Sequence, residues 1–260
     1  MDSLWVAKTG LEAQQTRMTV VSNNLANVNT TGFKRGRAVF EDLMYQNVRQ
    51  VGGSTSEDTQ APTGLLLGTG VRVVATEKMF TQGNHVETGN PLDLLVDGRG
   101  FFQVLQPDGS MAYTRDGSLK MDAEGRVVTS SGYEIQPSIN LPADALGISV
   151  SQDGIVQAKV PGQADLVTVG SLQLVDFANP AGLEAMGQNL FAETVASGAP
   201  QIGTPGLEGL GRVVQGALEG SNVNVVEELV NMIETQRAYE MNSKAIAASD
   251  QMLEYLNTSL

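Results

Sequence analysis

The sequence predicts an α+β fold, in which a mostly antiparallel β body carries long N- and C-terminal helices that pair as a coiled-coil-like assembly domain. Apolar residues recur every seven positions near each end of the chain, while the middle alternates short apolar runs with Asp-Gly and Ser-Gly turns. The chain also has 29 glycines and only 5% aromatic residues. Heptad spacing is typical of helices that pack on helices, and frequent tight turns are typical of short antiparallel strands.

The N-terminal helix is predicted from the start of the chain to the turn residues Asn27 and Gly32. Asp2 or Ser3 can cap its first turn, and Asn and Gly accept the left-handed backbone that ends helices. A narrow apolar seam of this kind is buried only against another helix. The predicted seam consists of Leu4, Leu11, Met18, Val21, Leu25 and Val28.

The C-terminal helix repeats this design after Asn224. Asn224 and Glu227 have the spacing of a capping box, and neither Gly nor Pro follows in the sequence. At 1.5 Å per residue, the helix should extend for about 50 Å. Its predicted seam consists of Val225, Leu229, Met232, Tyr239, Ile246 and Leu253. In the alternative interpretation, both helices pack on the β body as ordinary amphipathic helices.

The middle of the chain is predicted to be an antiparallel meander followed by a hairpin, a further strand and an irregular return. The meander strands are expected at 101–106, 111–115, 119–122, 126–129 and 133–136, the hairpin at 148–152 and 155–160, the further strand at 167–177 and the return at 197–221. The predicted domains are a helical assembly domain (1–33 with 221–260), a connector with an extended or β-hairpin segment (34–75) and a β-rich body (76–220).

Catalytic, metal-binding and cofactor-binding residues are not predicted, and no cofactor is expected. The sequence has no cysteine, a single histidine (His85) and no Gly-x-Ser-x-Gly nucleophile motif. Its Asp-Gly carboxylates are isolated, as in turns, whereas a calcium loop needs several at alternate positions. A net charge of −13 argues against nucleic acid as a partner.

The start of the chain has neither the basic region nor the long apolar run of a signal peptide, and no segment has the roughly 20 apolar residues of a membrane span. We therefore expect a chain that does not span a membrane and that either stays in the cytoplasm or leaves by a route without a cleaved leader. Lys34, Arg35 and Arg37 form a small basic cluster, for which a solvated loop is the simplest interpretation.

The segment Ser22–Lys34 resembles the signature that ends the first helix of bacterial flagellar rod and hook proteins. The segments 221–229 and 236–240 resemble the paired C-terminal element of this family, and 98–102 with 113–117 resembles a body element. The resemblance covers essentially the whole chain, and its length and the stretch Tyr45–Pro62 are similar to the distal rod members. The motif residues at the end of the first helix are Asn23, Asn24, Leu25, Ala26, Asn27, Thr31, Gly32, Phe33 and Lys34.

The resemblance implies a structural subunit of the distal rod in the flagellar basal body, with no enzymatic activity. Such a subunit is exported without signal-peptide cleavage and polymerises in the periplasm into a rigid helical tube, which reaches the outer-membrane ring. The tube transmits torque from motor to hook and encloses the export channel. The implied partners are further copies of the chain, proximal rod subunits, the hook protein, the outer-ring bushing proteins, the rod cap and the type III export apparatus.

The connector residues are associated in this family with a straight and stiff rod. The residues concerned are Tyr45, Gly52, Gly53, Pro62 and Gly64. We expect this segment to become ordered against neighbouring subunits, and the C-terminal helix to face the channel. The alternatives are a proximal-rod or hook-type subunit, a periplasmic enzyme with amphipathic terminal helices, and a monomeric adaptor whose helices bind another coiled coil.

Overall fold

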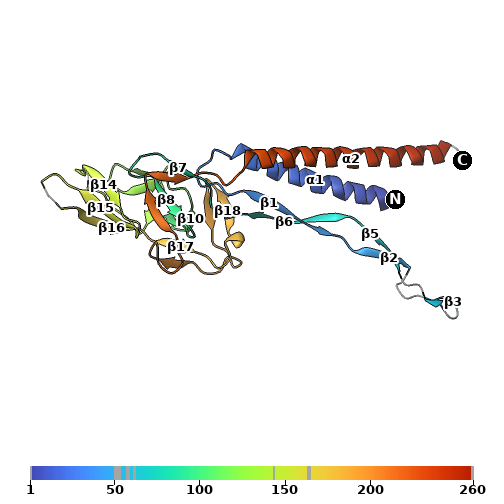
Figure 1. Ribbon diagram of the computed structural model, residues 1–260, viewed down its shortest axis with the longest axis horizontal. Helices are drawn as coiled ribbons and strands as arrows, with labels where there is room; N and C mark the ends of the chain where they lie inside the picture. Colours follow the sequence, from blue (N-terminus) through green and yellow to red (C-terminus); the bar gives the residue numbers. More distant parts are fainter. Residues whose placement is uncertain are drawn as a thin grey trace. The chain divides into compact units, whose positions relative to one another are not determined.

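The computed structural model describes residues 2–49, 54–56, 59–60, 63–142, 144–162 and 165–258. Within these residues the chain forms two long helices and many short antiparallel strands, which confirms the α+β class and the mostly antiparallel β body (Figure 1). It divides into two compact units. The helical unit comprises Met1–Leu25, Gly36–Glu77 and Val225–Leu260, and the body unit comprises Ala26–Arg35 and Lys78–Asn224.

The helical unit is built on α1 (Asp2–Ala26) and α2 (Val225–Thr258), which lie side by side and antiparallel (Figure 1). Asn24 near the end of α1 contacts Glu228 at the start of α2, and Gly10 faces Asn242 further along. α1 ends and α2 begins where the turn and cap residues predict, because these signals are local in sequence. Neither of these described helices is both long enough and apolar enough to cross a membrane.

A two-stranded ribbon completes the helical unit and packs on α1. The Val71 amide donates to Thr9 Oγ1 at 3.3 Å. Gly70 has φ +123°, and a Cβ there would lie 2.2 Å from Thr9 Oγ1, so only glycine fits this approach. The ribbon pairs β1 (Gly36–Asp42) with β6 (Val71–Lys78), β2 (Tyr45–Arg49) with β5 (Leu65–Gly68), and β3 (Ser54–Ser56) with β4 (Thr59–Gln60).

The body unit contains a seven-stranded antiparallel sheet in the order β11-β12-β13-β9-β10-β19-β18. Its strands are β9 (Phe102–Leu105), β10 (Met111–Thr114), β11 (Leu119–Met121), β12 (Val127–Thr129), β13 (Glu134–Gln136), β18 (Glu184–Gly187) and β19 (Leu190–Ala192). A three-stranded sheet holds β14 (Gly147–Val150), β15 (Ile155–Lys159) and β16 (Val167–Ser171). The remaining pairs are β7 (His85–Glu87) with β22 (Ala217–Glu219), β8 (Leu94–Asp97) with β21 (Arg212–Gln215), and β17 (Leu174–Asp176) with β20 (Gln201–Gly203), and one 3₁₀ turn, η1, spans Pro180–Gly182.

The predicted meander holds in three of its four pairings (β9 with β10, β11 with β12, and β12 with β13) and is wrong in the fourth, β10 with β11. β10 pairs with β19 and not with β11, and β13 returns to pair with β9 through Ile135 and Val104. The reason lies at Gly117, where a Cβ would be 1.7 Å from the Leu94 carbonyl oxygen. At this point the chain packs closely against β8. The hairpin expected between β10 and β11 therefore does not form. The predicted strand at 167–177 is likewise split into β16 and β17.

The body unit has two apolar clusters of its own. The larger includes Phe102, Val104 and Ile135, each at most 1% exposed. The smaller is aromatic, and Tyr113 packs edge-on against Phe177 with ring centroids 4.8 Å apart. Since burial of apolar area is the main favourable term in folding, these clusters give the body unit a complete core.

Candidate assembly interface

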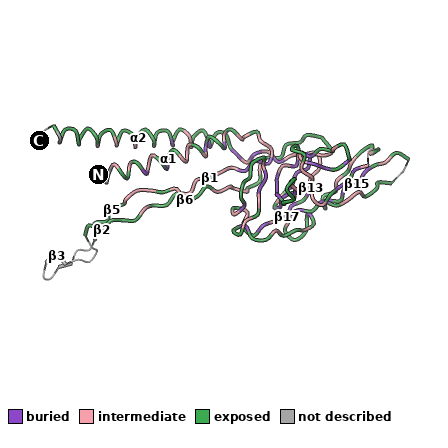
Figure 2. The backbone as a smooth tube through the Cα atoms, turned by 180° about the vertical axis from the view of Figure 1, so that it is seen from behind, coloured by how far each residue is buried: buried purple, intermediate pink, exposed green. Residues whose placement is uncertain are grey.

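The predicted seam of α2 lies mostly on exposed surface. Val225, Leu229, Tyr239 and Leu253 are 40 to 47% exposed, whereas Met232 and Ile246 are half-buried. Figure 2 shows α2 in the exposed colour along most of its length. The structure thus brings the seam residues together on one flank of α2, and the described residues leave most of this flank open.

The most deeply buried of the described residues of α2 are polar. Glu228 and Thr235 are at most 1% exposed, and Asn231, Asn242 and Ser249 are half-buried. Four seam residues, at 225, 232, 239 and 246, lie three positions before the polar residues at 228, 235, 242 and 249. This spacing places the two sets about 60° apart around the helix. The heptad of polar residues at 228, 235, 242 and 249 was the signal in the sequence that could have revealed this burial.

On α1 the predicted seam is better covered. Val21 is 5% exposed, and the remaining seam residues are half-buried, namely Leu4, Leu11, Met18, Leu25 and Val28. The most buried positions of α1 also include Thr9, Ala13 and Asn24, which the seam did not contain. Small and polar residues therefore make much of the contact on this helix as well.

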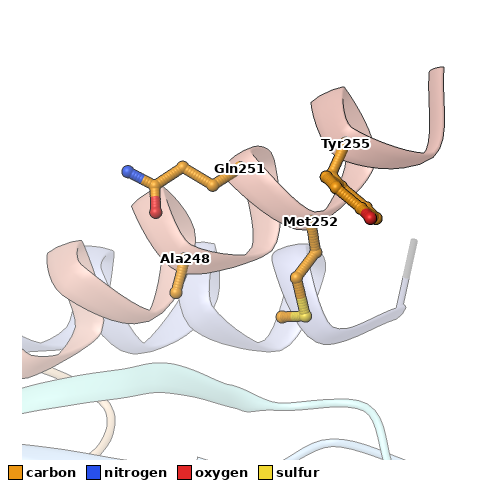
Figure 3. A pocket seen from close by; sticks show the side chains of 4 residues that line it. All are labelled: Ala248, Gln251, Met252 and Tyr255. Carbon is orange, nitrogen blue, oxygen red and sulfur yellow. The ribbon is translucent and has the colours of Figure 1, made fainter. Parts of the chain in front are cut away.

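Further apolar side chains are exposed along α2. Val230, Ile233 and Met241 are 50 to 65% exposed. Near the end of the helix, a shallow open groove is lined by Ala248, Gln251, Met252 and Tyr255 (Figure 3). An exposed apolar strip of this extent is typical of a protein–protein contact.

Asn24 of the motif connects three elements of the helical unit. Its Oδ1 accepts from the Gly36 amide at 2.8 Å, and its Nδ2 donates to the Gly36 carbonyl at 2.9 Å. The same Nδ2 lies 3.3 Å from Glu228 Oε2. Asn24 is only 2% exposed, so these bonds are shielded from water, and they fasten β1 to both helices.

Lys34, at the other end of the motif, is buried in the body unit, so the solvated-loop interpretation is wrong for this residue. Its Nζ donates to Glu219 Oε1 at 2.6 Å, and Arg115 Nη1 lies 3.4 Å from Glu219 Oε2. All three side chains are at most 4% exposed. Burial lowers the pKa of Lys34, and Glu219 opposes that shift. A buried cation needs such a counter-ion, which explains why the lysine faces inward.

The residues before Lys34 fix the turn that follows α1. The Gly32 amide donates to the Glu219 carbonyl at 2.8 Å, and Gly32 has φ +70°. A Cβ there would lie 2.8 Å from the Asp116 nitrogen, so glycine is required. The Thr31 carbonyl accepts from Asn189 Nδ2, and Phe33 is buried beneath the Lys78 ammonium, 4.3 Å from its ring centroid. Asn23 and Ala26 are exposed, and Leu25 and Asn27 are half-buried.

The stiffness residues of the connector that the structure describes, Tyr45 and Gly64, are not buried. Tyr45 is 56% exposed and pairs in register with Gly68, and Gly64 is half-buried. A hydrogen bond with Asp42 raises the pKa of Tyr45. Gly52, Gly53 and Pro62 lie outside the described residues.

His85 lies on the surface, with its Nε2 3.0 Å from Gln82 Nε2. In the described part of the chain, no group of three or more His, Asp or Glu side chains could hold a metal ion.

Three family models match the chain. The model described as "Flagella basal body rod protein" matches residues 4–34, "Flagellar hook protein FlgE/F/G D1 domain" matches 95–158, and "Flagellar basal body rod FlgEFG protein C-terminal" matches 214–259. These ranges include most of α1, much of the body unit and all of α2.

Full-length relatives agree with these matches. The flagellar basal-body rod protein FlgG of Buchnera aphidicola subsp. Schizaphis graminum is 57% identical over 98% of both chains. The protein of that name from Borreliella burgdorferi is 47% identical over 99% of this chain and 98% of its own, and that from Agrobacterium fabrum is 45% identical over 100% of both.

Proposed function

The chain belongs to the family of flagellar basal-body rod proteins, and from this premise we propose that it forms the distal rod, a rigid helical tube that transmits torque from motor to hook and encloses the export channel. The chain is a structural subunit of the flagellar rod and not an enzyme. Its proposed site is the periplasm, up to the outer-membrane ring, after type III export.

The observation that supports polymerisation is the open apolar flank of α2. Burying one Leu or Val side chain contributes about 1.5–3 kcal/mol, so several partly exposed residues can together stabilise a contact between subunits. We infer that the flank packs against helices of neighbouring copies in a coiled-coil-like manner. A head-to-tail contact that does not close on itself generates a helical filament.

Sedimentation over a concentration series, with circular dichroism on the same samples, tests this proposal. The full chain should form large assemblies above a critical concentration, and the variant Leu229→Ser with Leu253→Ser should not. Val195→Ser is the matched control, because it removes a fully exposed apolar side chain from the body unit. If the double variant and the control assemble alike, the α2 flank is not the contact.

The ribbon supports a second part of the proposal, the stiffness of the rod. Leu65, Leu66 and Leu67 follow one another along β5 and are 47 to 52% exposed. We propose that the connector packs on neighbouring subunits and locks them in line. Deletion of 46–61 should therefore give assemblies that bend, as measured from their curvature in electron micrographs; straight, rigid assemblies would refute this role.

The proposed neighbours in the rod are further copies of the chain, proximal rod subunits and the hook protein. The outer-ring bushing proteins, the rod cap and the export apparatus are proposed as additional partners. We also propose that α2 faces the channel, with acidic residues such as Glu240 and Glu254 in contact with water. A density map that places α1 at the lumen would contradict this orientation.

A further inference from the structure

The chain passes between the two units four times, at Leu25–Ala26, Arg35–Gly36, Glu77–Lys78 and Asn224–Val225. Force that travels along the backbone from one unit to the other must pass through these segments. Their attachment inside the body unit therefore decides whether they are loaded singly or together.

Asn222 connects three of these segments inside the body unit. Its Oδ1 accepts from the Arg35 amide at 2.7 Å, and its Nδ2 donates to the Met79 carbonyl at 2.8 Å. The same Nδ2 lies 2.9 Å from Thr81 Oγ1 and 3.1 Å from the Thr81 carbonyl. Asn222 itself lies two residues before the last crossing, so one side chain holds the segments at 35, 79–81 and 222.

Further hydrogen bonds join the same segments. The Met79 amide donates to the Arg35 carbonyl at 2.8 Å. Lys78 Nζ donates to the Lys34 carbonyl at 3.1 Å. The three segments are thus connected pairwise, and Asn222 is the residue that contacts both of the others through its side chain.

The buried ion cluster fixes this arrangement to the body core. Lys34 Nζ donates to the Thr81 carbonyl at 2.8 Å and to Glu219. Arg115, on the other side of Glu219, donates to the Val96 carbonyl at 3.2 Å and the Gly98 carbonyl at 2.6 Å, at the end of β8. The segments are therefore held to each other and to a strand of the core.

We propose that Asn222 is the positioning residue of a load-bearing joint, in which three crossing segments are tied in fixed register so that twist applied to one is shared by all. Bonds that act in parallel each carry a fraction of the applied force. A segment without bonds to the other two would carry all of the force on it and would detach from the body unit more easily. The inference rests on the proposed function, since only a subunit that transmits torque loads this joint.

Hydrogen exchange on the full-length monomer tests the connection directly, with Asn222→Asp as the variant. The aspartate can still accept from the Arg35 amide, but it cannot donate to the Met79 and Thr81 carbonyls and repels them. Loss of such bonds should raise exchange at the Met79, Arg35 and Asn222 amides together, by about tenfold to a hundredfold. The amides of β9 and β10 should not change.

Asn179→Asp is the matched control, because Asn179 Nδ2 donates to one body carbonyl, that of Ala196, at 3.1 Å, away from the crossings. The proposed joint would be overturned if exchange at the Met79 and Arg35 amides rose equally in both variants. It would also be overturned if exchange in the test variant rose only at the amide of residue 222.

The mechanical role of the joint is tested by complementation, in which cells with the gene deleted carry either the wild-type gene or a variant. The wild-type chain should restore filaments, and if it does not, the proposed function fails independently of the joint. Cells with Asn222→Asp should shed filaments at least about twice as often as Asn179→Asp cells when viscous load is raised, with similar filament counts at rest. Equal shedding under load would overturn the joint. If the variant forms no rods, the exchange measurement decides the question.

Discussion

The two units of the molecule differ in the share of apolar residues that they bury. The body unit encloses Phe102, Val104 and Tyr113, all at most 1% exposed. The helical unit encloses Glu228 and Thr235 and leaves Leu229 and its apolar neighbours open to solvent. Burial of the two apolar clusters stabilises the body unit, whereas exposed apolar side chains along α2 are available to a partner. This difference supports the proposal that the helical unit is the part that assembles.

The largest expected effect is the loss of the counter-ion in the body unit. Glu219→Ala leaves Lys34 and Arg115 as buried cations without their carboxylate, which should cost about 3–5 kcal/mol of unfolding free energy. Urea unfolding followed by near-ultraviolet circular dichroism measures this value. Lys34→Met should cost less, since Glu219 keeps Arg115 and the Gly83 amide as partners. Equal losses for the two variants would contradict this account.

A smaller effect is expected where the ribbon meets α1. Gly70→Ala forces a Cβ toward Thr9 Oγ1 and strains a backbone at φ +123°, at a cost of about 1–3 kcal/mol. The loss should be confined to the helical unit, so hydrogen exchange should accelerate at Val71 and along α1. Gly89→Ala, also at positive φ but with open space around it, controls for backbone strain. An equal response of α1 to both would exclude the contact with Thr9 as the cause.

The next effect separates assembly from folding. Tyr239→Ser removes an aromatic group that is 46% exposed, so unfolding of the monomer should change by no more than about 0.5 kcal/mol. The critical concentration for assembly should rise about tenfold, which corresponds to about 1.4 kcal/mol per contact. Light scattering during dilution measures it. A monomer destabilised as much as the assembly would mean that Tyr239 packs within its own chain.

The last effect, which appears only at high pH, is a pH dependence in the body unit. Burial and the neighbouring Glu193 raise the pKa of Tyr113 to about 12. An unfolded tyrosine loses its proton near pH 10, so unfolding releases a proton between about pH 10 and 12. The contribution of Tyr113 is therefore complete below pH 10 and is lost as the pH rises through 12. In Tyr113→Phe, unfolding stability should fall less steeply over this window; an unchanged slope would contradict the raised pKa.

Features with local causes could be predicted from the sequence. The start of α2 after Asn224 and the end of α1 before Asn27 follow from capping and turn residues that act within a few positions. The short strands and the hairpin of β14 and β15 follow from turn dipeptides in the same way. The identity of the family followed from the motif that ends at Lys34.

Features with distant causes could not be predicted. Lys34 and Glu219 are 185 positions apart, and no spacing rule pairs them, so a basic cluster suggested solvent. The order of the seven-stranded sheet depends on how closely Gly117 approaches β8, which is a contact and not a pattern. The burial of Glu228 and Thr235 was not predicted, because a seam prediction selects apolar residues alone. Whether the exposed seam pairs with another copy stays a prediction.

The distance in sequence between Lys34 and Glu219 also determines when the body unit can finish folding. If the chain is threaded through a narrow channel, as the proposed export requires, 185 further residues must follow whichever of the two charges emerges first before they can meet. Until then Lys34 has no counter-ion, and burying its unpaired charge in the body unit is unfavourable in free energy. Completion of the body thus coincides with arrival of nearly the whole polypeptide. In the proposed export, the chain would therefore remain unfolded until most of it has passed through the channel.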